Sequence, residues 1–253
     1  MALAFSRDAA AMAFAVLCYV GLVNFVAAQE APQNKGCVLD NCADKKPPSP
    51  APVAPSAPQP RANTPGDFDF HVLALSWSPG FCDTGGAGKA HAQCASGAHL
   101  GFVVHGLWPQ YQHGFPSDCS GIRSPSQLAL EAAKGLYPDE GLARFEWRKH
   151  GTCSGKSPTD YFADVRKARE AITIPPPFRA ATQAQTWTPI DIQRAFIAAN
   201  PRLRPGMLAV ECYAGELDEV RICFSKDLHD FVACPEVSRH FCYTQQVSVP
   251  PMR

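Results

Sequence analysis

Gly101-Phe-Val-Val-His-Gly-Leu-Trp-Pro109 joins a short apolar run to a histidine and a tryptophan, and this stretch does most to decide the expected fold. Residues 101–105 are rich in strand-forming side chains and are bounded by glycines, which is typical of a buried β-strand. His71-Val-Leu-Ala-Leu-Ser-Trp77 has the same character. We therefore predict buried strands over 71–77 and 101–105, with His105 at the end of the second.

The rest of the apolar pattern predicts a hairpin and four helices. Two apolar runs, 207–213 and 220–224, flank Ala214-Gly215 and favour a hairpin whose loop is longer than the two-residue minimum. Helices are expected over 126–136, 143–152, 159–172 and 189–199, and the last two begin with a hydroxyl cap, a proline and an early acid. Strands and helices are mixed without strict alternation, so the sequence predicts an α+β fold.

A second stretch, Glu146-Trp-Arg-Lys-His-Gly-Thr-Cys153, carries an acid, a cation and an imidazole. If residues 144–153 are helical, Glu146, Lys149 and His150 stand at i, i+3 and i+4 and share one face. Phe145 and Trp147 would then point elsewhere, toward packing. Glu146 could orient His150 or hold it charged.

These residues, together with His105, favour phosphoryl transfer. A histidine, with an ordinary pKa of about 6.5, can donate or accept a proton near neutral pH. A lysine can stabilise negative charge that develops on a phosphorane. Two imidazoles and one cation therefore supply an acid, a base and an electrostatic stabiliser.

The N-terminal region predicts an exported protein with one catalytic domain. Arg7, the apolar run 9–23 and the small residues 26–28 indicate a signal peptide over 1–28. An uncleaved membrane anchor is the alternative, because the run is nearly long enough to span a bilayer. We interpret 29–66 as a short cysteine-containing segment with a Pro/Ala-rich linker, and 67–253 as the catalytic domain. Lys plus Arg and Asp plus Glu each number 23, so no basic excess indicates a general nucleic-acid coat or a membrane-binding surface.

The cysteines favour disulfides over metal ligation. Ten of the eleven lie beyond the predicted signal peptide, an even number in an exported protein, and no Cys-x-x-Cys spacing occurs. Cys37 and Cys42 precede the linker, and their role is open. The eight cysteines of the domain allow many pairings, so the connectivity does not follow from the sequence alone.

The chain resembles the ribonuclease T2 family, which carries a His-Gly-Leu-Trp-Pro box and a Glu-Trp-x-Lys-His-Gly-Thr-Cys box. Both boxes are intact here, and the similarity extends from Phe70 to Cys242. The resemblance implies a central, mostly antiparallel sheet flanked by helices and stapled by disulfides. It also implies an endoribonuclease that cleaves single-stranded RNA with low base specificity, through a 2′,3′-cyclic phosphate to 3′-phosphate products. No metal or other cofactor is expected, and DNA should be inert because the ribose 2′-hydroxyl is the nucleophile.

The family's catalytic roles carry over to matching positions. His105 is expected to be the general acid and His150 the general base, although the sequence alone leaves open which ring does which task. Glu146 and Lys149 would stabilise the transition state. The expected protein is a monomer without stable membrane association after signal cleavage, in the periplasm, outside the cell or in a secretory compartment.

The resemblance also implies a site for the RNA bases. Trp108 matches a residue that stacks on the base 5′ to the cut, and Phe115 falls where the family usually has another aromatic. Gln110 stands where many relatives have Asp or Asn, so base preference is open. Phe145 is a departure, because several relatives have a phosphate-contacting histidine there.

The family pattern implies four disulfides. The second of them would tie the loop after the first box to the end of the catalytic helix and keep His105 and His150 in register. The bridges are Cys82–Cys94, Cys119–Cys153, Cys212–Cys242 and Cys223–Cys234.

Two other functions are compatible with parts of the pattern. A binding module that keeps the nuclease scaffold without using it is disfavoured, because the acid, base, cation and carboxylate are all present. A zinc hydrolase is disfavoured because no His-Glu-x-x-His spacing occurs. We interpret the remaining histidines as surface or packing residues: His71, His91, His99, His113, His229 and His240.

Overall fold

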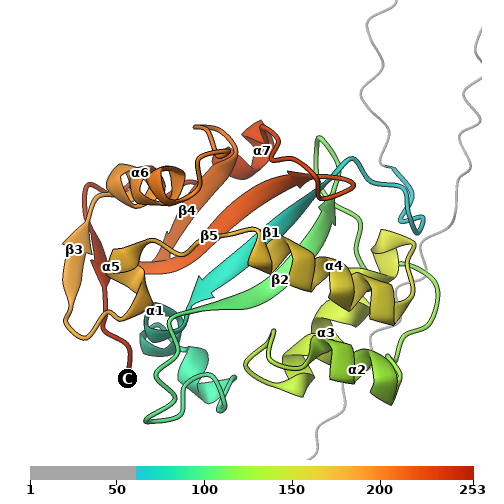
Figure 1. Ribbon diagram of the computed structural model, residues 1–253, viewed down its shortest axis with the longest axis horizontal. Coiled ribbons are helices and arrows are strands. Elements are labelled where there is room, and N and C mark those ends of the chain that lie inside the picture. The colour runs from blue at the N-terminus through green and yellow to red at the C-terminus, as the bar shows by residue number, and fades with distance from the viewer. Residues whose placement is uncertain (1–60) are drawn as a thin grey trace, which may run out of the picture. The chain divides into compact units, whose positions relative to one another are not determined.

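A six-stranded sheet organises residues 61–253, the part of the chain that the structure, a computed structural model, describes (Figure 1). The strand order is β2-β1-β5-β6-β3, and β4 also pairs with β5. Every pairing is antiparallel except the contact between β5 and β6. The prediction of an α+β fold with a mostly antiparallel sheet is therefore confirmed. The strands are β1 (Phe70–Trp77), β2 (Phe102–Gln110), β3 (Gln185–Trp187), β4 (Leu208–Tyr213), β5 (Glu216–Ser225) and β6 (Val247–Val249).

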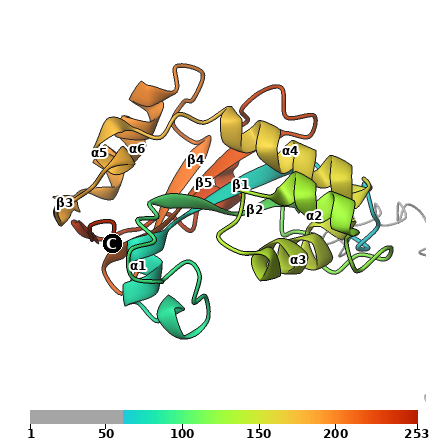
Figure 2. The same ribbon diagram turned by 60° about the horizontal axis from the view of Figure 1, so that its bottom comes forward.

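Five of the described helices form two groups at opposite ends of the sheet. Figure 2 shows α2, α3 and α4 together at one end, and α5 and α6 with β3 at the other. Two short 3₁₀ turns, η1 (Gly86–Gly88) and η2 (Gly151–Ser154), complete the fold. The helices are α1 (Ser78–Asp83), α2 (Gln127–Ala133), α3 (Glu140–Lys149), α4 (Pro158–Glu170), α5 (Pro176–Arg179), α6 (Pro189–Ala199) and α7 (Pro235–Ser238).

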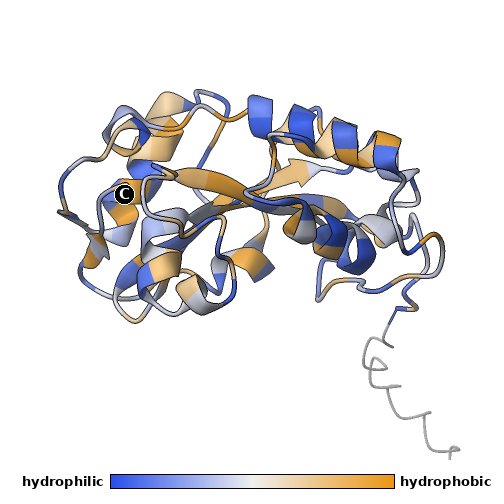
Figure 3. Cartoon of the chain, turned by 90° about the horizontal axis from the view of Figure 1, so that it is seen from below, coloured by the Kyte–Doolittle hydropathy of each residue, from blue (hydrophilic) through white to orange (hydrophobic). Residues whose placement is uncertain are grey.

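The two faces of the sheet carry different side chains. Leu73 and Leu75 of β1 point into the main hydrophobic core, which residues of α4 and α6 complete. Figure 3 shows apolar residues along the central strands. It also shows hydrophilic residues on the outer sides of the helices. Ala74 and Ser76 alternate with the leucines and therefore face the other way. Their small side chains leave room on that second face.

A β-bulge places His105 on the second face. Ala74 lies opposite Gly106, whereas Leu75 lies opposite Val104, so His105 has no partner on β1. Strict alternation would put His105 on the same side as Leu107, which is fully buried in the main core. The extra residue instead turns the imidazole to the opposite side. His105 thus lies within a strand that continues to Gln110, and the prediction that it ends a strand was wrong.

The β4–β5 hairpin corrects a second prediction. Its loop is only Ala214-Gly215, and both residues have positive φ, 50° and 86°. That geometry is the tight turn that two-residue hairpins favour. The longer loop expected from the sequence was wrong because β5 begins at Glu216, in a polar stretch whose charges conceal the strand.

The predicted helices all form, with shifted ends. The segment 189–199 is helical as predicted, and α4 begins one residue earlier and ends two residues earlier than expected. The helix expected over 126–136 ends at Ala133, before Gly135 adopts a positive φ of 75°. The helix expected over 143–152 begins at Glu140, because Asp139 accepts a hydrogen bond from the Leu142 amide at 2.9 Å, and it ends at Lys149.

The four disulfides of the structure are the pairings that the family resemblance implies: Cys82–Cys94, Cys119–Cys153, Cys212–Cys242 and Cys223–Cys234. The second joins the loop after β2 to η2, which directly follows α3. This bridge therefore connects the segments that contain the two sequence boxes. Cys37, Cys42 and the predicted signal peptide lie outside the described residues.

Part of the predicted linker packs on the domain. The Gly66 amide donates to the Cys153 carbonyl at 2.9 Å, and the Asn63 amide side chain donates to the Ser117 carbonyl at 3.0 Å. Residues 61–66 thus brace the same loops that carry the second disulfide. Within residues 61–253, none of the helices has the length and apolar character needed to cross a membrane.

Gly80→Ala is expected to destabilise the fold, because a Cβ at position 80 would overlap the backbone carbonyl of Leu217. Backbone cannot move aside as a side chain can, so α1 or β5 must shift, at a cost of about 1–3 kcal/mol. Urea unfolding measures this loss. Gly88→Ala is the matched control, because no atom lies within 4 Å of a Cβ there. Equal stability of the two variants would contradict the close packing of α1 on β5.

Candidate active site

His105 lies between two buried carboxylates. Its Nδ1 is hydrogen-bonded to the Glu219 carboxylate, and its Nε2 is 3.7 Å from Oε1 of Glu146. Partial burial opposes the charged form of the ring, but the bond to Glu219 and the charges of Glu219 and Glu146 outweigh it. They raise the pKa of His105 to about 9. The imidazole is therefore held protonated at neutral pH.

Glu146 faces His105 and Trp108. Its side chain is buried, and its Oε2 accepts a hydrogen bond from the Trp108 indole nitrogen at 2.8 Å. Burial raises the pKa of Glu146 to about 7, against the opposing charge of His105 and the bond from Trp108. The hypothesis that Glu146 orients or charges His150 was wrong. The carboxylate of Glu146 contacts Trp108 and His105 instead, and it is not among the groups that shift the pKa of His150, the C-cap residue of α3.

His150 has the opposite electrostatic environment. The ring is buried, and its Nδ1 has no hydrogen-bond partner among the described residues. Burial, followed by the charges of Lys149 and His105, lowers the pKa of His150 to about 3. The Trp108 ring is near both histidines, with its centroid 5.2 Å from that of His105 and 5.3 Å from that of His150. One imidazole is thus held charged and the other neutral, next to the same indole.

A cavity of about 310 Å³ opens beside His150. Its wall contains the predicted base-site residues Trp108, Gln110 and Phe115, together with the predicted catalytic Lys149. Phe115 is 54% exposed, so one face of its ring is available to a ligand. The remaining wall is Val72, Gly114, Arg221, Glu236, Val237 and His240.

Phe145 lies outside this cavity. It is 41% exposed, so the prediction that it points toward packing was wrong, whereas Trp147 is buried as predicted. The Lys149 ammonium lies 6.0 Å from the centre of the Phe145 ring. His71 is buried as a packing residue, and His240, interpreted as a surface residue, is exposed at the cavity rim.

Glu219 and Arg221 were missed by the sequence analysis. Both lie on β5 and face the same side of the sheet as Ala74 and Ser76 of β1, their direct partners. The available signal was the pair of charged residues at i and i+2 that flanks Val220, next to the apolar residues 222–224. Charges at that spacing share one face of a strand, and charges in a central strand require buried partners.

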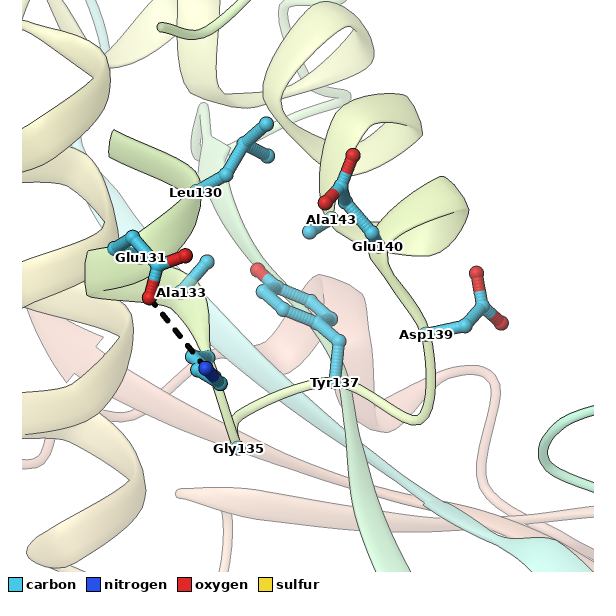
Figure 4. Close-up of a pocket in the computed structure, with 9 residues that line it drawn as sticks. Leu130, Glu131, Ala133, Gly135, Tyr137, Asp139, Glu140 and Ala143 are labelled. Carbon is cyan, nitrogen blue, oxygen red and sulfur yellow. Dashed lines mark ion pairs between the residues drawn. The ribbon is translucent and has the colours of Figure 1, made fainter. Parts of the chain in front are cut away.

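A separate cavity of about 340 Å³ lies between α2 and α3 (Figure 4). Leu130, Ala133, Ala143 and Tyr137 line it, and an ion pair of 3.6 Å between Lys134 and Glu131 stands at its edge. Its wall contains no histidine, so it has none of the acid and base groups of the site around Trp108. Within residues 61–253, no three His, Cys, Asp or Glu side chains are grouped as metal ligands would be.

The sequence model of the Ribonuclease T2 family matches residues 68–234. A protein called Ribonuclease from Aeromonas hydrophila is 38% identical over 180 residues, which cover 68% of this chain and 78% of that protein. Ribonuclease DdI of Dictyostelium discoideum is 29% identical over 207 residues, which cover 72% of this chain and 84% of that protein.

Solved structures share the fold. An RNase-related protein from Calystegia sepium superposes with a TM-score of 0.59 at 23% identity, covering 74% of this chain and 98% of that one. A mutant of RNase MC1 in complex with 5′-UMP gives a TM-score of 0.56 at 22% identity, covering 71% of this chain and 97% of that one.

Gly106→Ala is expected to disrupt the carboxylate pocket, because a Cβ there would overlap the Glu146 carboxylate and the Trp108 indole nitrogen. A hydrogen bond to a charged group contributes about 1.5–3 kcal/mol, so its loss should speed solvent exchange of the Trp108 indole proton by about tenfold or more. Hydrogen exchange followed by NMR measures this rate. Gly88→Ala is again the control. An unchanged rate in Gly106→Ala would show that the hydrogen bond between Trp108 and Glu146 does not require a glycine at position 106.

Proposed function

This chain is an endoribonuclease of the ribonuclease T2 family, and we propose that it cleaves single-stranded RNA with low base specificity through a 2′,3′-cyclic phosphate. The observation that carries the proposal is the opposite environment of its two histidines. An acid must hold a proton and a base must lack one at the same pH. His105, with a pKa of about 9, and His150, with a pKa of about 3, meet these conditions across the neutral range.

The proposed first step begins at the ribose 2′-hydroxyl. The neutral His150 ring takes its proton, the 2′ oxygen attacks phosphorus, and the departing 5′ oxygen receives a proton from Nε2 of His105. Nε2 is the free nitrogen of that ring, since Nδ1 is bonded to Glu219. In the second step water opens the cyclic phosphate with the two roles reversed, which leaves a 3′-phosphate.

Lys149 and Glu146 are proposed to stabilise the phosphorane. Lys149 lines the cavity beside His150, where its ammonium can face a phosphate oxygen. Glu146 has one oxygen, Oε1, without a hydrogen-bond partner among the described residues, and this oxygen lies toward His105. This set supplies acid, base and cation from side chains alone, so cleavage is expected to continue in excess chelator.

The bases are proposed to bind in the cavity between Trp108 and Phe115. Stacking on aromatic rings tolerates every base, because each base presents a π-face. Gln110, at the same wall, is the amide that can contact a base edge. These wall residues support low base specificity, with a preference that Gln110 sets. DNA is expected to be inert, because it lacks the 2′-hydroxyl nucleophile.

We also propose that the protein is exported and works as a monomer in the periplasm, the extracellular medium or a secretory compartment. Residues 1–28 would be removed as a signal peptide, 29–66 would form a spacer, and 67–253 would be the catalytic domain, without stable membrane association. The four disulfides support an oxidising compartment.

His105→Ala and His150→Ala are each expected to lower kcat by roughly 10²- to 10⁴-fold, the usual contribution of a general acid or base. His229→Ala is the control, because His229 is exposed in the loop after β5 and does not line the cavity. Initial rates on a single-stranded oligoribonucleotide measure the effect, and chromatography identifies the cyclic product. Near wild-type turnover in either alanine variant, or cleavage of a strand with one 2′-deoxyribose at the scissile position, would refute the mechanism.

The pH profile of kcat/KM is expected to be a broad plateau. Activity requires neutral His150, so it rises as pH increases through the His150 pKa of about 3. Activity also requires protonated His105, so it is lost as pH rises through the His105 pKa of about 9. Initial rates between these limits test both. An alkaline limb at the ordinary histidine pKa of about 6.5 would contradict the proposed acid.

A further inference from the structure

A row of charged side chains adjoins His105: Glu219, which is buried, Arg221, which also lines the cavity, and Glu211. The Glu219 carboxylate bonds Nδ1 of His105 with one oxygen and accepts a hydrogen bond from Nε of Arg221 at 2.9 Å with the other. Arg221 in turn forms an ion pair with Glu211, with Nη1 2.5 Å from Oε1. The proposed catalytic steps use none of these three side chains directly.

The strand register explains how the row forms. Glu219 pairs with Ser76 of β1 and with Glu211 of β4, and partners directly opposite one another share a face of the sheet. Arg221 follows two residues later and therefore lies on that face as well. The bulge in β2 turns His105 toward the same face, across the small side chains of β1. Three strands thus bring one imidazole and one buried carboxylate together.

We propose that Glu219 is the positioning residue of the general acid: it fixes His105 with Nδ1 protonated, directs Nε2 to the leaving oxygen, and keeps the ring charged. Arg221 holds the Glu219 carboxylate in place. This inference rests on the proposed function, because it assigns Glu219 through the role of His105. It makes Glu219 necessary for turnover although Glu219 touches neither the base nor the phosphate.

Glu146 does not replace Glu219 in this role. Its nearest oxygen is 3.7 Å from Nε2 of His105, too far for a hydrogen bond, and burial raises its own pKa to about 7. The pKa of Glu219 is lowered instead: burial would raise it, but the bond and charge of His105 and the charge of Arg221 prevail. Glu219 is therefore the permanent anion beside the ring. The charged or titratable groups around His105 are Glu146 of α3, His150 after α3, and Asp218, Glu219 and Arg221 of β5.

The experiment is an NMR titration of the His105 ring in the wild-type protein and in Glu219→Gln, with kcat and KM measured on the same samples. An opposite charge in contact shifts a pKa by about 1–3 units, so the His105 pKa should fall by at least about one unit in the variant. The alkaline limb of the rate profile should move with it. We expect kcat to fall by roughly 10- to 100-fold, less than loss of the ring itself, with KM nearly unchanged.

Two further variants separate positioning from stability. Glu216→Gln removes another carboxylate of β5 outside the charge row, and it should leave the His105 pKa and kcat unchanged. Glu219→Asp keeps the charge on a shorter side chain, so the His105 pKa should remain high while kcat falls. It also tests the proposal if Glu219→Gln fails to fold.

An unchanged His105 pKa in Glu219→Gln, or full turnover in Glu219→Asp, would overturn the proposal. A loss of kcat without any shift of the alkaline limb would also overturn it, since it would indicate structural damage alone. Failure of the proposed function would look different. In that case the wild-type protein would not cleave RNA, while the NMR titration would still report whether Glu219 holds the His105 proton.

Discussion

One unpaired residue in β2 determines the position of His105, the proposed acid. Without the bulge, His105 would share the buried side of Leu107, and its imidazole would be enclosed by apolar side chains. The neighbouring glycine is part of the same constraint, because any side chain at Gly106 would occupy the space of the Glu146 carboxylate. A bulge interrupts the regular hydrogen bonding between strands, and a glycine within a strand lowers its stability. Their combination here places one imidazole between two carboxylates and beside the Trp108 indole.

The chemistry follows from two identical side chains in different surroundings. His150 is buried, and within residues 61–253 the charges that act on its pKa are those of Lys149 and His105, so its neutral form is favoured. His105 contacts Glu219 and faces Glu146, so its charged form is favoured despite partial burial. Both pKa shifts arise from the surroundings of the rings, since the two imidazoles are chemically identical. The surroundings therefore support the proposed roles of His105 as acid and His150 as base, which the sequence boxes alone left open.

Sequence reasoning recovered what is encoded locally and missed what tertiary contacts decide. Thr188 caps α6 and Pro189 starts it, so that helix was predicted to the residue. The contact of Glu146 with His105 was not predictable in this way. It depends on where α3 ends and on which strand packs against α3. Glu219 was hidden for the same reason: a carboxylate in β5 reaches His105 only through the register of three strands. The three-residue strands β3 and β6 are too short to give a periodic signal.

Covalent links join segments around the site that are distant in sequence. Cys119–Cys153 fixes the loop after Phe115 to the turn after His150, and the Asp118 amide donates to the Lys149 carbonyl at 2.8 Å in the same place. Cys223–Cys234 joins β5, two residues beyond Arg221, to the start of α7, which supplies the opposite wall of the cavity. Each bridge thus ties a segment next to a proposed catalytic group, or to its supporting charge, to another part of the fold. Because a bulged strand and a helix end are locally adaptable, we expect these bridges to limit how far the side chains beside them can move.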